Sequence, residues 1–427
     1  MKKNLLLIIM LVVSTNISNA QNKNNGEYII PAVVNEKWGF INEYGQWIVE
    51  PKFDNAYPCN DNSVAIASFQ INNKWGYIDQ NGKIIIEPQF EEVGDNFSNG
   101  ITKIFENNKW GCIDKKGKIV IEPKYDYLRF LSIGGLIKME LNGKYGIIDK
   151  TGSTVAEPTF ESIDDYSTNG LALIKLNDKY GFINTTGKIV IEPQFDDADS
   201  FSEQGLAPVK IDEKWGCINQ SGKIIIEPKY ESINSFNANG LARIKQNDKY
   251  GFINTTGKIV VEPQYDDAGS FSELGLAPVK IDGKWGYITQ TGKMTIQPQF
   301  KNAKPFDNNG IAEVVIDSKK GLIDSTGKFV LDPMMDLRKI EKHTNLGLYV
   351  IDVNREKGFI DNSGKIVVKP QYDDIILFGD VIFVQTNKKW GIIDKLGKTV
   401  AEPKFDIVVG IFLSIVEDDF FIDVFDE

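Results

Sequence analysis

The sequence predicts an all-β protein made of tandem repeats of about 35 residues. Each repeat is expected to be an antiparallel meander of three strands, with a connector able to add a fourth. Three landmarks predict this class. A Gly preceded by an aromatic residue or Lys recurs eleven times, and a Pro that usually follows an acidic residue recurs at the same intervals along the chain. A second Gly always comes six residues after the first. Apolar and polar residues alternate between the landmarks without a sustained 3.6-residue period, which favours strands over helices.

The unit that follows Gly275 shows how each strand is predicted. Residues 276–281 alternate, with the apolar side chains on one face, as in a half-buried strand. Asp282 and Gly283 fit a two-residue type I′ hairpin, because Asx and Gly tolerate a positive φ. The hairpin leads into the second strand, residues 284–288.

The third strand follows a turn that ends in Gly. Residues 289–292 end in Gly292, which suits the left-handed position of a type I turn with a bulge. The strand itself, residues 293–296, is expected to end at Pro298, which has no N–H for the ladder. About a dozen residues then lead to the next unit, and the two aromatic residues they often carry predict a packed connector or a fourth strand.

A meander of this size cannot bury its apolar face alone, so neighbouring units must stack. We expect a superhelical array, with propeller-like rings as the alternative. Eleven units exceed the usual four to eight blades of one ring, so that alternative requires two rings or an open spiral. In this scheme residues 21–333 hold nine copies, the ninth degenerate. Residues 334–403 hold the last two copies after a seam near 334–348, and residues 404–427 are a degenerate terminal unit with an acidic end.

The first landmark defines the candidate structural residues of the array. Nine of the eleven copies carry an aromatic residue directly before the Gly, and the ninth and tenth copies carry Lys320 and Lys357 instead. The landmark pairs are Trp38 and Gly39, Trp75 and Gly76, Trp110 and Gly111, Tyr145 and Gly146, Tyr180 and Gly181, Trp215 and Gly216, Tyr250 and Gly251, Trp285 and Gly286, and Trp390 and Gly391.

Residues 74–88 read Lys-Trp-Gly-Tyr-Ile-Asp-x-x-Gly-Lys-x-x-Ile-x-Pro, and this pattern resembles the WG-repeat, or KWG-repeat, family of bacterial proteins. The resemblance covers about residues 28–406. Tyr145, Tyr180 and Tyr250 depart from the motif, as do the lysines of the ninth and tenth copies. The resemblance implies β-rich repeats in exported or surface proteins, without a common enzymatic activity or a general ligand.

Residues 1–20 predict a cleaved secretory signal peptide. Lys2 and Lys3 precede an apolar run of about nine residues, which is too short to span a bilayer. Small residues stand before Gln21, as signal peptidase requires. Cleavage after Ala20 would make the mature protein periplasmic or secreted. No later apolar stretch reaches spanning length, so no membrane span is expected.

The charge of the chain restricts its partners. The 427 residues include 48 Lys and Arg and 59 Asp and Glu. Removal of the first twenty residues, which hold two Lys, leaves 46 basic against 59 acidic residues and a net charge of −13. Nucleic acid would need a basic face and is excluded as a partner. We expect a protein partner with a neutral or cationic surface, and cell-wall glycan is the alternative.

Residues with catalytic chemistry are scarce. His343 is the only His, so no Ser-His-Asp or Cys-His pair can recur and no zinc triad is available. Cys112 and Cys217 occupy a slot that is apolar in the other copies, and Cys59 lies in a connecting segment. This distribution predicts structural, unpaired thiols. We expect no enzymatic activity and no cofactor.

The aromatic landmarks allow two interpretations. The rings could form a line of stacking platforms for sugars, one in each unit. They could instead form a buried ladder, in which each ring packs over the neighbouring Gly because that residue has no Cβ. The Gly beside every ring favours the buried ladder, so we expect a structural role.

Charged residues form two further series. The acid before each Pro, such as Glu192, is expected to pair with the Lys before each aromatic residue, such as Lys179, and each exposed pair should contribute less than about 1 kcal/mol. Acidic doublets such as Asp196-Asp197 lack the alternating spacing of calcium loops, so calcium is a minor alternative.

These observations predict an exported, non-enzymatic scaffold that binds a protein through an extended repeat surface. Two alternatives stay open. One is a cell-wall or polysaccharide-binding module. The other, less favoured, is a glycoside hydrolase, which requires only two suitably spaced carboxylates.

Overall fold

A computed structural model of the chain describes residues 30–405, except 35–36, 42–46, 60–65, 95–96, 334–336, 344–346 and 379–380. The expected signal peptide and residues 406–427, which make up nearly all of the expected terminal unit, lie outside the described residues. So do the side chains of Cys59, His343 and Trp390.

The described residues form eleven antiparallel sheets and no helix, which confirms the all-β repeat prediction. We number the sheets along the chain. Sheet 1 has three strands: β1 (Ile30–Val34), β2 (Lys37–Ile41) and β3 (Trp47–Phe53). Each of the other ten sheets has four strands.

The bounds of the four-stranded sheets are as follows. Sheets 2 to 4 consist of β4 (Asn55–Cys59), β5 (Ile66–Ile71), β6 (Lys74–Asp79) and β7 (Ile84–Phe90); β8 (Glu92–Val93), β9 (Ile101–Glu106), β10 (Lys109–Asp114) and β11 (Ile119–Tyr125); and β12 (Tyr127–Phe130), β13 (Ile137–Leu141), β14 (Lys144–Ile148) and β15 (Thr154–Phe160). Sheets 5 to 7 consist of β16 (Ser162–Tyr166), β17 (Leu171–Leu176), β18 (Lys179–Asn184) and β19 (Ile189–Phe195); β20 (Asp197–Ala198), β21 (Leu206–Ile211), β22 (Lys214–Asn219) and β23 (Ile224–Tyr230); and β24 (Ser232–Ile233), β25 (Leu241–Gln246), β26 (Lys249–Asn254) and β27 (Ile259–Tyr265). Sheets 8 to 11 consist of β28 (Asp267–Ala268), β29 (Leu276–Ile281), β30 (Lys284–Thr289) and β31 (Met294–Phe300); β32 (Asn302–Ala303), β33 (Ile311–Ile316), β34 (Lys319–Asp324) and β35 (Phe329–Leu331); β36 (Leu337–His343), β37 (Leu348–Val353), β38 (Glu356–Asp361) and β39 (Ile366–Tyr372); and β40 (Asp374–Phe378), β41 (Val381–Thr386), β42 (Lys389–Ile393) and β43 (Thr399–Phe405).

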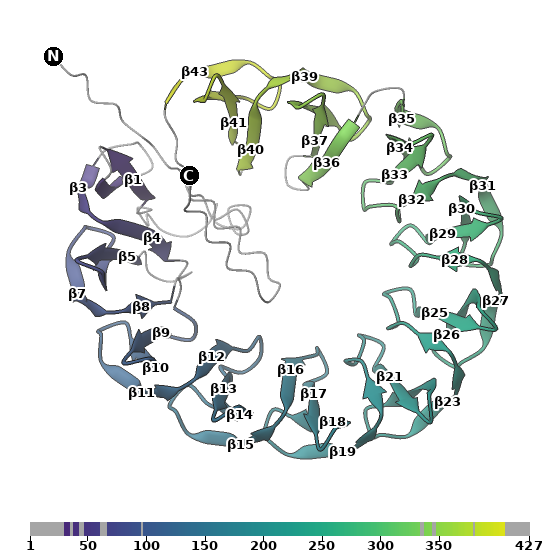
Figure 1. Ribbon diagram of the computed structural model, residues 1–427, viewed down its shortest axis with the longest axis horizontal. Helices are drawn as coiled ribbons and strands as arrows, with labels where there is room; N and C mark the ends of the chain where they lie inside the picture. The colour runs from purple at the N-terminus through teal and green to yellow at the C-terminus, as the bar shows by residue number, and fades with distance from the viewer. Residues whose placement is uncertain are drawn as a thin grey trace, which may run out of the picture.

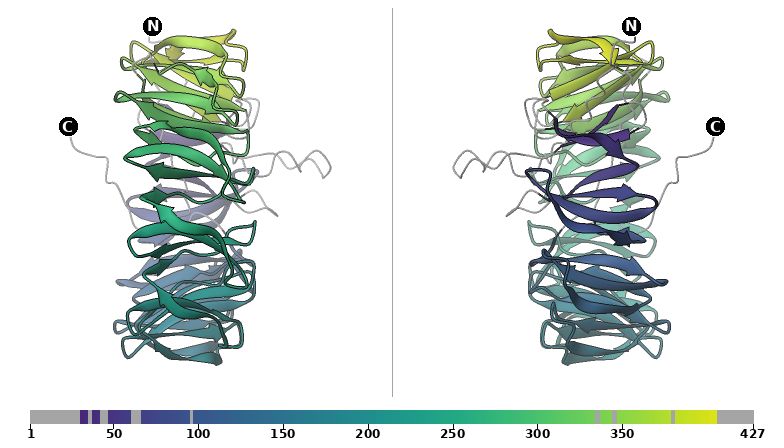
Figure 2. Two further views of the ribbon diagram at one scale, coloured as in Figure 1. Left: turned by 90° about the vertical axis from the view of Figure 1, so that its right-hand side faces the viewer. Right: turned by 90° about the vertical axis from the view of Figure 1, so that its left-hand side faces the viewer.

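Eleven sheets follow one another around a single ring, with the last strand of each sheet outermost (Figure 1). The edge-on views show one turn, with the first and last sheets at the same level (Figure 2). This is the geometry of the propeller-like alternative, but it needs neither two rings nor a spiral. One ring holds all eleven sheets because each sheet is rotated only slightly about the ring axis relative to the sheet before it (Figure 1).

The connector supplies the innermost strand of the next sheet, which settles the question of a fourth strand. In sheet 6, β20 pairs with β21, β21 with β22, and β22 with β23. The chain leaves sheet 5 on the outermost strand β19 and enters sheet 6 on the innermost strand β20. A repeat counted from one aromatic landmark to the next therefore joins the outer half of one sheet to the inner half of its neighbour.

Each sheet that has a neighbouring sheet on either side buries both of its faces. In β29, Leu276 packs in a cluster with Phe306 of sheet 9, whereas Ala277 and Val279 pack in a cluster with Phe252 of sheet 7. One such apolar cluster joins every pair of consecutive sheets. The expectation of a half-buried strand is therefore wrong, because neighbouring sheets cover the strand from both sides.

The two turns of the unit have the predicted backbone. Asp282 and Gly283 have φ values of 48° and 79°, as a type I′ hairpin requires. Gly292 has a φ of 80°, and its N–H donates to the Thr289 carbonyl oxygen over 2.9 Å. Both turns are thus confirmed.

Pro298 lies inside the outermost strand rather than ending it. β31 continues through the Pro to Phe300, and its outer edge has no neighbouring strand among the described residues. An edge strand tolerates Pro because the missing N–H would have no partner there. The expected end of the third strand is therefore wrong, and the Pro also discourages another chain from pairing with the exposed edge.

In the eight copies from Gly39 to Gly286, the Gly after the aromatic residue faces the Pro of the outermost strand. Beside Gly286 the register between β30 and β31 shifts at a bulge. A Cβ on Gly286 would lie 2.4 Å from the Ile296 carbonyl oxygen and 2.7 Å from the Pro298 nitrogen. This Gly is required by the backbone of the outer strand, and not by the neighbouring ring as the sequence interpretation proposed.

The expected seam near residues 334–348 falls between sheets 9 and 10. β35 has only three residues, and Lys320 replaces the aromatic landmark in the strand beside it. Leu331, Leu337 and Tyr349 nevertheless belong to one buried cluster, so packing continues across this place. A domain boundary here stays a prediction.

Candidate functional site

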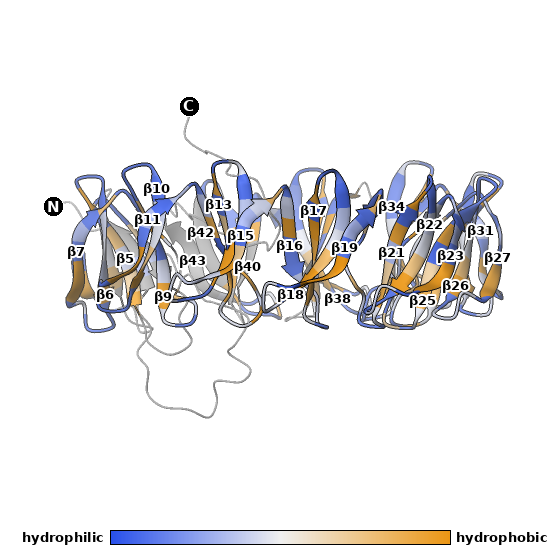
Figure 3. Ribbon diagram, turned by 90° about the horizontal axis from the view of Figure 1, so that it is seen from below, coloured by the Kyte–Doolittle hydropathy of each residue, from blue (hydrophilic) through white to orange (hydrophobic). Residues whose placement is uncertain are grey.

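Each sheet has two ends, which give the ring two faces. The tip face carries the hairpins between the second and third strands of each sheet, such as Asp212-Glu213. The turn face carries the turns into the outermost strand, such as residues 219–222. Seen edge-on, the strands of the ring change from hydrophobic to hydrophilic between one face and the other (Figure 3).

The aromatic landmarks lie beside the apolar clusters. Trp75 is 8% exposed, and most of the others are half-buried and pack against a cluster: Trp38, Trp110, Tyr145, Tyr180, Trp215, Tyr250 and Trp285. A cation from the preceding strand lies over several of the rings. Lys103 is 5.0 Å from the Trp110 ring centre, and Lys175 is 5.6 Å from that of Tyr180. In these copies a ring face is already occupied by an ammonium group.

The lysines that directly precede the aromatic landmarks pair with a different acid from the one expected. Lys179 Nζ lies 2.5 Å from Asp196 Oδ1, three residues after the Pro, and the same tie joins Lys249 to Asp266 over 2.6 Å. Glu192, the acid before the Pro, is exposed on the outermost strand. The expected pairing is wrong because the outer strand carries that acid away from the tip face, whereas the crossing to the next sheet passes beside the Lys.

The acid after the Pro ties two sheets together. Asp196 follows the last strand of sheet 5 and accepts the Lys179 hydrogen bond there, while its second oxygen accepts the N–H of Asp212 in sheet 6 over 2.9 Å. Asp54 joins Lys37 to the N–H of Asn72 in the same way. These ties fix the hairpins of the tip face relative to the preceding sheet.

The inter-sheet ties predict a loss of stability in acid. The hydrogen bond from Lys179 is the main cause that lowers the pKa of Asp196 below its ordinary value of 3.8. The pKa values of Asp54, Asp126 and Asp266 are lowered in the same way by Lys37, Lys109 and Lys249. Because the folded pKa is below the unfolded one, this contribution is present above about pH 4 and is lost as the pH falls through the folded value. Urea midpoints should therefore decrease below about pH 4.

A variant with Asp54, Asp126, Asp196 and Asp266 all replaced by Asn should show a smaller decrease in urea midpoint in acid than the wild type. The matched control removes four exposed acids of the outer strands: Glu122→Gln, Glu157→Gln, Glu192→Gln and Glu227→Gln. The control should keep the acid dependence of the wild type. Equal pH profiles for the two variants would contradict the assignment.

Three consecutive hairpins present an acidic residue on the tip face. Asp178, Glu213 and Asp248 are 90%, 84% and 90% exposed at their side chains. A carboxylate oxygen of each lies within 3.1 Å of Nζ of the Lys three residues earlier in the same hairpin. We call these three residues the acidic tips. The supporting lysines in sheets 5 and 7 also lie over the landmark rings of Tyr180 and Tyr250.

Lysines occupy the opposite face. The residue after the Gly of the turn is an exposed Lys in most units: Lys83, Lys118, Lys188, Lys223, Lys258, Lys293, Lys328, Lys365 and Lys398. The turn itself is held by its first residue. The Asn184 side-chain oxygen accepts the N–H groups of Thr186 and Lys188 over 3.1 and 3.0 Å. The Asp or Asn of the repeat motif was the available sequence signal for this role, which the sequence analysis missed.

At the innermost strands two acids lie near each other, and sequence reasoning missed this pairing although Asp164 belongs to one of the acidic doublets. Asp164 lies in β16 of sheet 5, and Asp199 occupies the equivalent position in sheet 6, directly after β20. Partial burial, and then the carboxylates of Asp197 and Asp164, raise the pKa of Asp199. The signal was present in the sequence: residues 179–219 recur almost unchanged at residues 249–289, and the residue equivalent to Asp199 in the second segment is Gly269. Treating the copies as equivalent concealed this difference.

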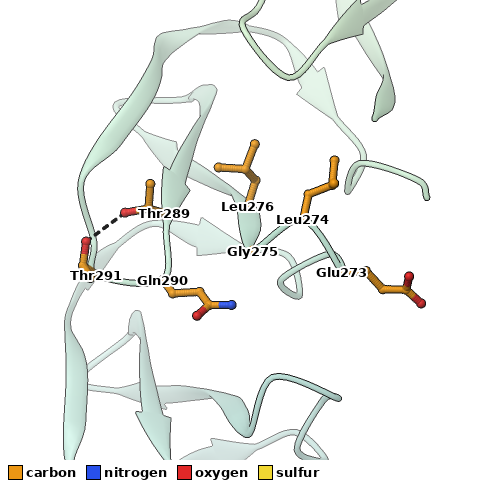
Figure 4. Close-up of a pocket in the computed structure, with 7 residues that line it drawn as sticks. All are labelled: Glu273, Leu274, Gly275, Leu276, Thr289, Gln290 and Thr291. Carbon is orange, nitrogen blue, oxygen red and sulfur yellow. Dashed lines mark hydrogen bonds between the residues drawn. The ribbon is translucent and has the colours of Figure 1, made fainter. Parts of the chain in front are cut away.

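A shallow hollow of about 330 Å³ lies on the turn face of sheet 8 (Figure 4). Leu274, which is 48% exposed, and the side chain of Gln290 line it, and the hydroxyls of Thr289 and Thr291 are 3.0 Å apart beside it. Glu273 is its one carboxylate. The hollow therefore lacks the carboxylate pair that glycoside hydrolysis requires.

The acidic doublets and the cysteines have structural contacts. In the doublet of sheet 6, Asp196 forms the inter-sheet tie and Asp197 accepts the N–H of Ala198 over 2.9 Å. No group of three or more potential metal ligands occurs within the described ranges. Cys112 and Cys217 are buried and unbonded to each other, as expected, and burial raises the pKa of both thiols to about 12.

The fold and these surfaces define a class: a repeat protein whose antiparallel sheets form a ring, with three acidic tips and their paired lysines on one face and a row of exposed lysines on the other. The chain belongs to the family described as WG containing repeat. The family matches residues 38–75, 75–110, 110–145, 145–180, 180–215, 215–250, 250–285, 285–319, 358–390 and 390–411. The unmatched interval lies between the two copies in which Lys replaces the aromatic residue.

Solved structures share only a distant likeness with the chain. A eukaryotic initiation factor has a TM-score of 0.41 at 12% identity, over 80% of this chain and 95% of that one. The extracellular domain of a putative one-component system from B. thetaiotaomicron has a TM-score of 0.26 at 10% identity, over 90% and 72%. AztD from Citrobacter koseri has 0.28 at 13% identity, over 70% and 92%. No match was found among curated proteins. In the described part of the chain, no helix is long and apolar enough to cross a membrane.

Proposed function

We propose that this protein is an exported, non-enzymatic scaffold that binds a protein with a neutral or cationic surface across several sheets of its tip face. The observation that carries the proposal is the row of acidic tips. Asp178, Glu213 and Asp248 occupy equivalent hairpins of three consecutive sheets and are largely exposed. A cationic partner would meet them at regular intervals.

The fixed position of the hairpins supports the proposal. Asp196 binds both Lys179 and the hairpin that carries Glu213, and Glu161 accepts the N–H groups of the hairpin that carries Asp178. Loops held in this way lose less conformational entropy on binding. Several weak contacts on one rigid surface also reinforce each other through effective concentration.

Export rests on the first twenty residues, whose pattern is that of a cleaved signal peptide. We place the mature protein in the periplasm or outside the cell, where partners include envelope proteins. The acidic balance of the mature chain agrees with a partner that is not itself strongly acidic.

The two alternatives have weaker support. For a polysaccharide-binding module, stacking would need open ring faces, but Lys103 and Lys175 lie over the rings of Trp110 and Tyr180. For a glycoside hydrolase, Asp199 with its raised pKa is the residue to examine first. A retaining or inverting enzyme would then require a second carboxylate at about 5–10 Å and a cleft for the sugar.

The proposal is tested by reversing the acidic tips. A triple variant, Asp178→Lys, Glu213→Lys and Asp248→Lys, should lose most of the envelope protein that the wild type captures, because the partner would meet like charge. Immobilised wild type and variant are incubated with solubilised bacterial envelope extract, and captured proteins are quantified by mass spectrometry. Binding of the protein so identified should weaken as salt is added.

A matched control reverses three exposed lysines of the same sheets on the turn face: Lys188→Glu, Lys223→Glu and Lys258→Glu. The control should retain the captured protein. Capture that is unaffected by the tip variant would contradict the proposed surface. Sedimentation of both variants with insoluble peptidoglycan would favour the glycan alternative, and hydrolysis of that glycan, abolished by Asp199→Asn, would favour the enzyme.

A further inference from the structure

Sheet 1 has an incomplete inner edge. Ten sheets have four strands, and in each of them the innermost strand pairs with the strand that follows it, as β20 pairs with β21. Sheet 1 has only β1, β2 and β3, so β1 has no described neighbour on its inner side. Sheet 1 also lies beside sheet 11 across the break in the ring (Figure 1).

The missing strand has a counterpart beyond the last described strand. In every other unit the innermost strand begins within a few residues of the outermost strand before it, as β20 follows β19. The chain continues after Phe405 with Asp-Ile-Val-Val-Gly-Ile, residues 406–411. The last match to the family also runs from 390 to 411, past the end of β43. Residues 406–411 thus begin another unit.

We propose that residues 407–411 pair with the free edge of β1 and complete sheet 1, which closes the ring. The phase of the repeat fixes the register. In sheet 6, Asp197 pairs with Lys210 and Ala198 with Val209. The same spacing places Ile407 opposite Val33.

Two backbone hydrogen bonds define this register further. In sheet 6 the N–H of Asp196 donates to the carbonyl oxygen of Lys210, and the N–H of Asp199 donates to the carbonyl oxygen of Pro208. The equivalent bonds run from Asp406 to Val33 and from Val409 to Pro31. A Pro is compatible with this place because only its carbonyl oxygen takes part, as at Pro208 and Pro278.

The composition of the two surfaces agrees with closure. The cluster between sheets 5 and 6 is built from ten buried positions. All ten equivalents at the junction of sheets 11 and 1 are apolar: Val381, Phe383, Ile392, Ala401, Phe405, Val408, Ile411, Ile30, Ala32 and Ile41. An eleventh apolar cluster would therefore join the two ends as ten clusters join the other sheets.

The residues before β1 fit the edge less well. In the phase of the repeat, Ala20 and Gln21 correspond to Asp197 and Ala198, and Asn24 corresponds to the buried Phe201. Polar Gln21 and Asn24 would thus occupy apolar positions. Cleavage after Ala20, which the signal peptide predicts, would moreover end the chain within this stretch. The segment after β43 is the better occupant.

Disulfide trapping tests the proposed register in the full chain. Cys at positions 33 and 407, introduced by Val33→Cys and Ile407→Cys, should form a disulfide within one chain, since opposed residues of antiparallel strands lie at a suitable distance. The control pair, Ala32→Cys with Ile407→Cys, is one residue out of register and should form at least about tenfold less. Mass spectrometry of linked peptides separates these bonds from those of the natural cysteines.

A second measurement does not depend on the cysteine variants. A chain that ends at Phe405 should exchange the amide hydrogens of β1 at least about tenfold faster than the full chain, because the edge is uncovered. β17 in sheet 5 serves as the internal reference and should be unaffected. Equal exchange in β1 would overturn the proposal. A 33–407 disulfide found only between two chains would instead assign the edge to a second copy.

Discussion

Replacing Gly251 with Val should decrease the free energy of unfolding by more than about 2 kcal/mol. A Cβ at this position would lie 2.6 Å from both the Pro263 nitrogen and the Val261 carbonyl oxygen. Both atoms belong to the backbone of the outermost strand, so they cannot rotate away as a side chain would. Relief would require the bulge to open, and with it the pairing of β26 and β27. Urea denaturation of wild type and variant measures the effect.

Gly283→Asn provides the control for the Gly251 variant. A Cβ at Gly283 would have no heavy atom within 4 Å, and Asn73 and Asn108 occupy the equivalent hairpin position with positive φ values. Asn tolerates this conformation, so the change in free energy should be below about 0.5 kcal/mol. Similar urea midpoints for Gly251→Val and wild type would contradict the steric explanation of the landmark.

The local structure of a unit could be predicted from the sequence because its turns depend on neighbouring residues. Asp282-Gly283 and Gly292 determine the backbone of their turns wherever the unit lies. The constant step between Gly286 and Pro298 was equally visible, but its cause was not. The two residues meet only across a bulged strand pair, and a contact of this kind depends on the register of the strands.

The arrangement of the units and the ion pairs could not be read in the same way. Whether units form a spiral or a ring depends on a small rotation between sheets, which no single residue encodes. Likewise Lys179 was assigned to Glu192 because the two series share one period, but every residue of a repeat shares that period. The partner, Asp196, is determined by the crossing from one sheet to the next. The acidic tips, by contrast, could have been located from the hairpin prediction.

Deleting Lys179 to Asp248 should leave a folded protein with two fewer sheets. The deletion removes 70 residues, or two units, and joins Asp178 to Lys249 at equivalent hairpin positions. β17 would then pair with β26 as β25 does, and Phe252 would replace Phe182 at the junction. Because each sheet contacts its immediate neighbours, the remaining clusters should survive. A monomeric elution volume, strand-type circular dichroism and a cooperative melting transition are the expected results.

Deleting 50 residues, from 179 to 228, should instead give aggregates. This deletion joins Asp178 directly to Lys229, so that β17 loses both β18 and β19 and no strand of equivalent phase replaces them. The buried faces of sheets 4 and 7 would then be exposed, and exposed apolar strands associate. The two deletions remove a similar length of chain but differ in phase. Equal solubility and equal melting behaviour of both proteins would therefore show that stacking in phase is not what holds the ring together.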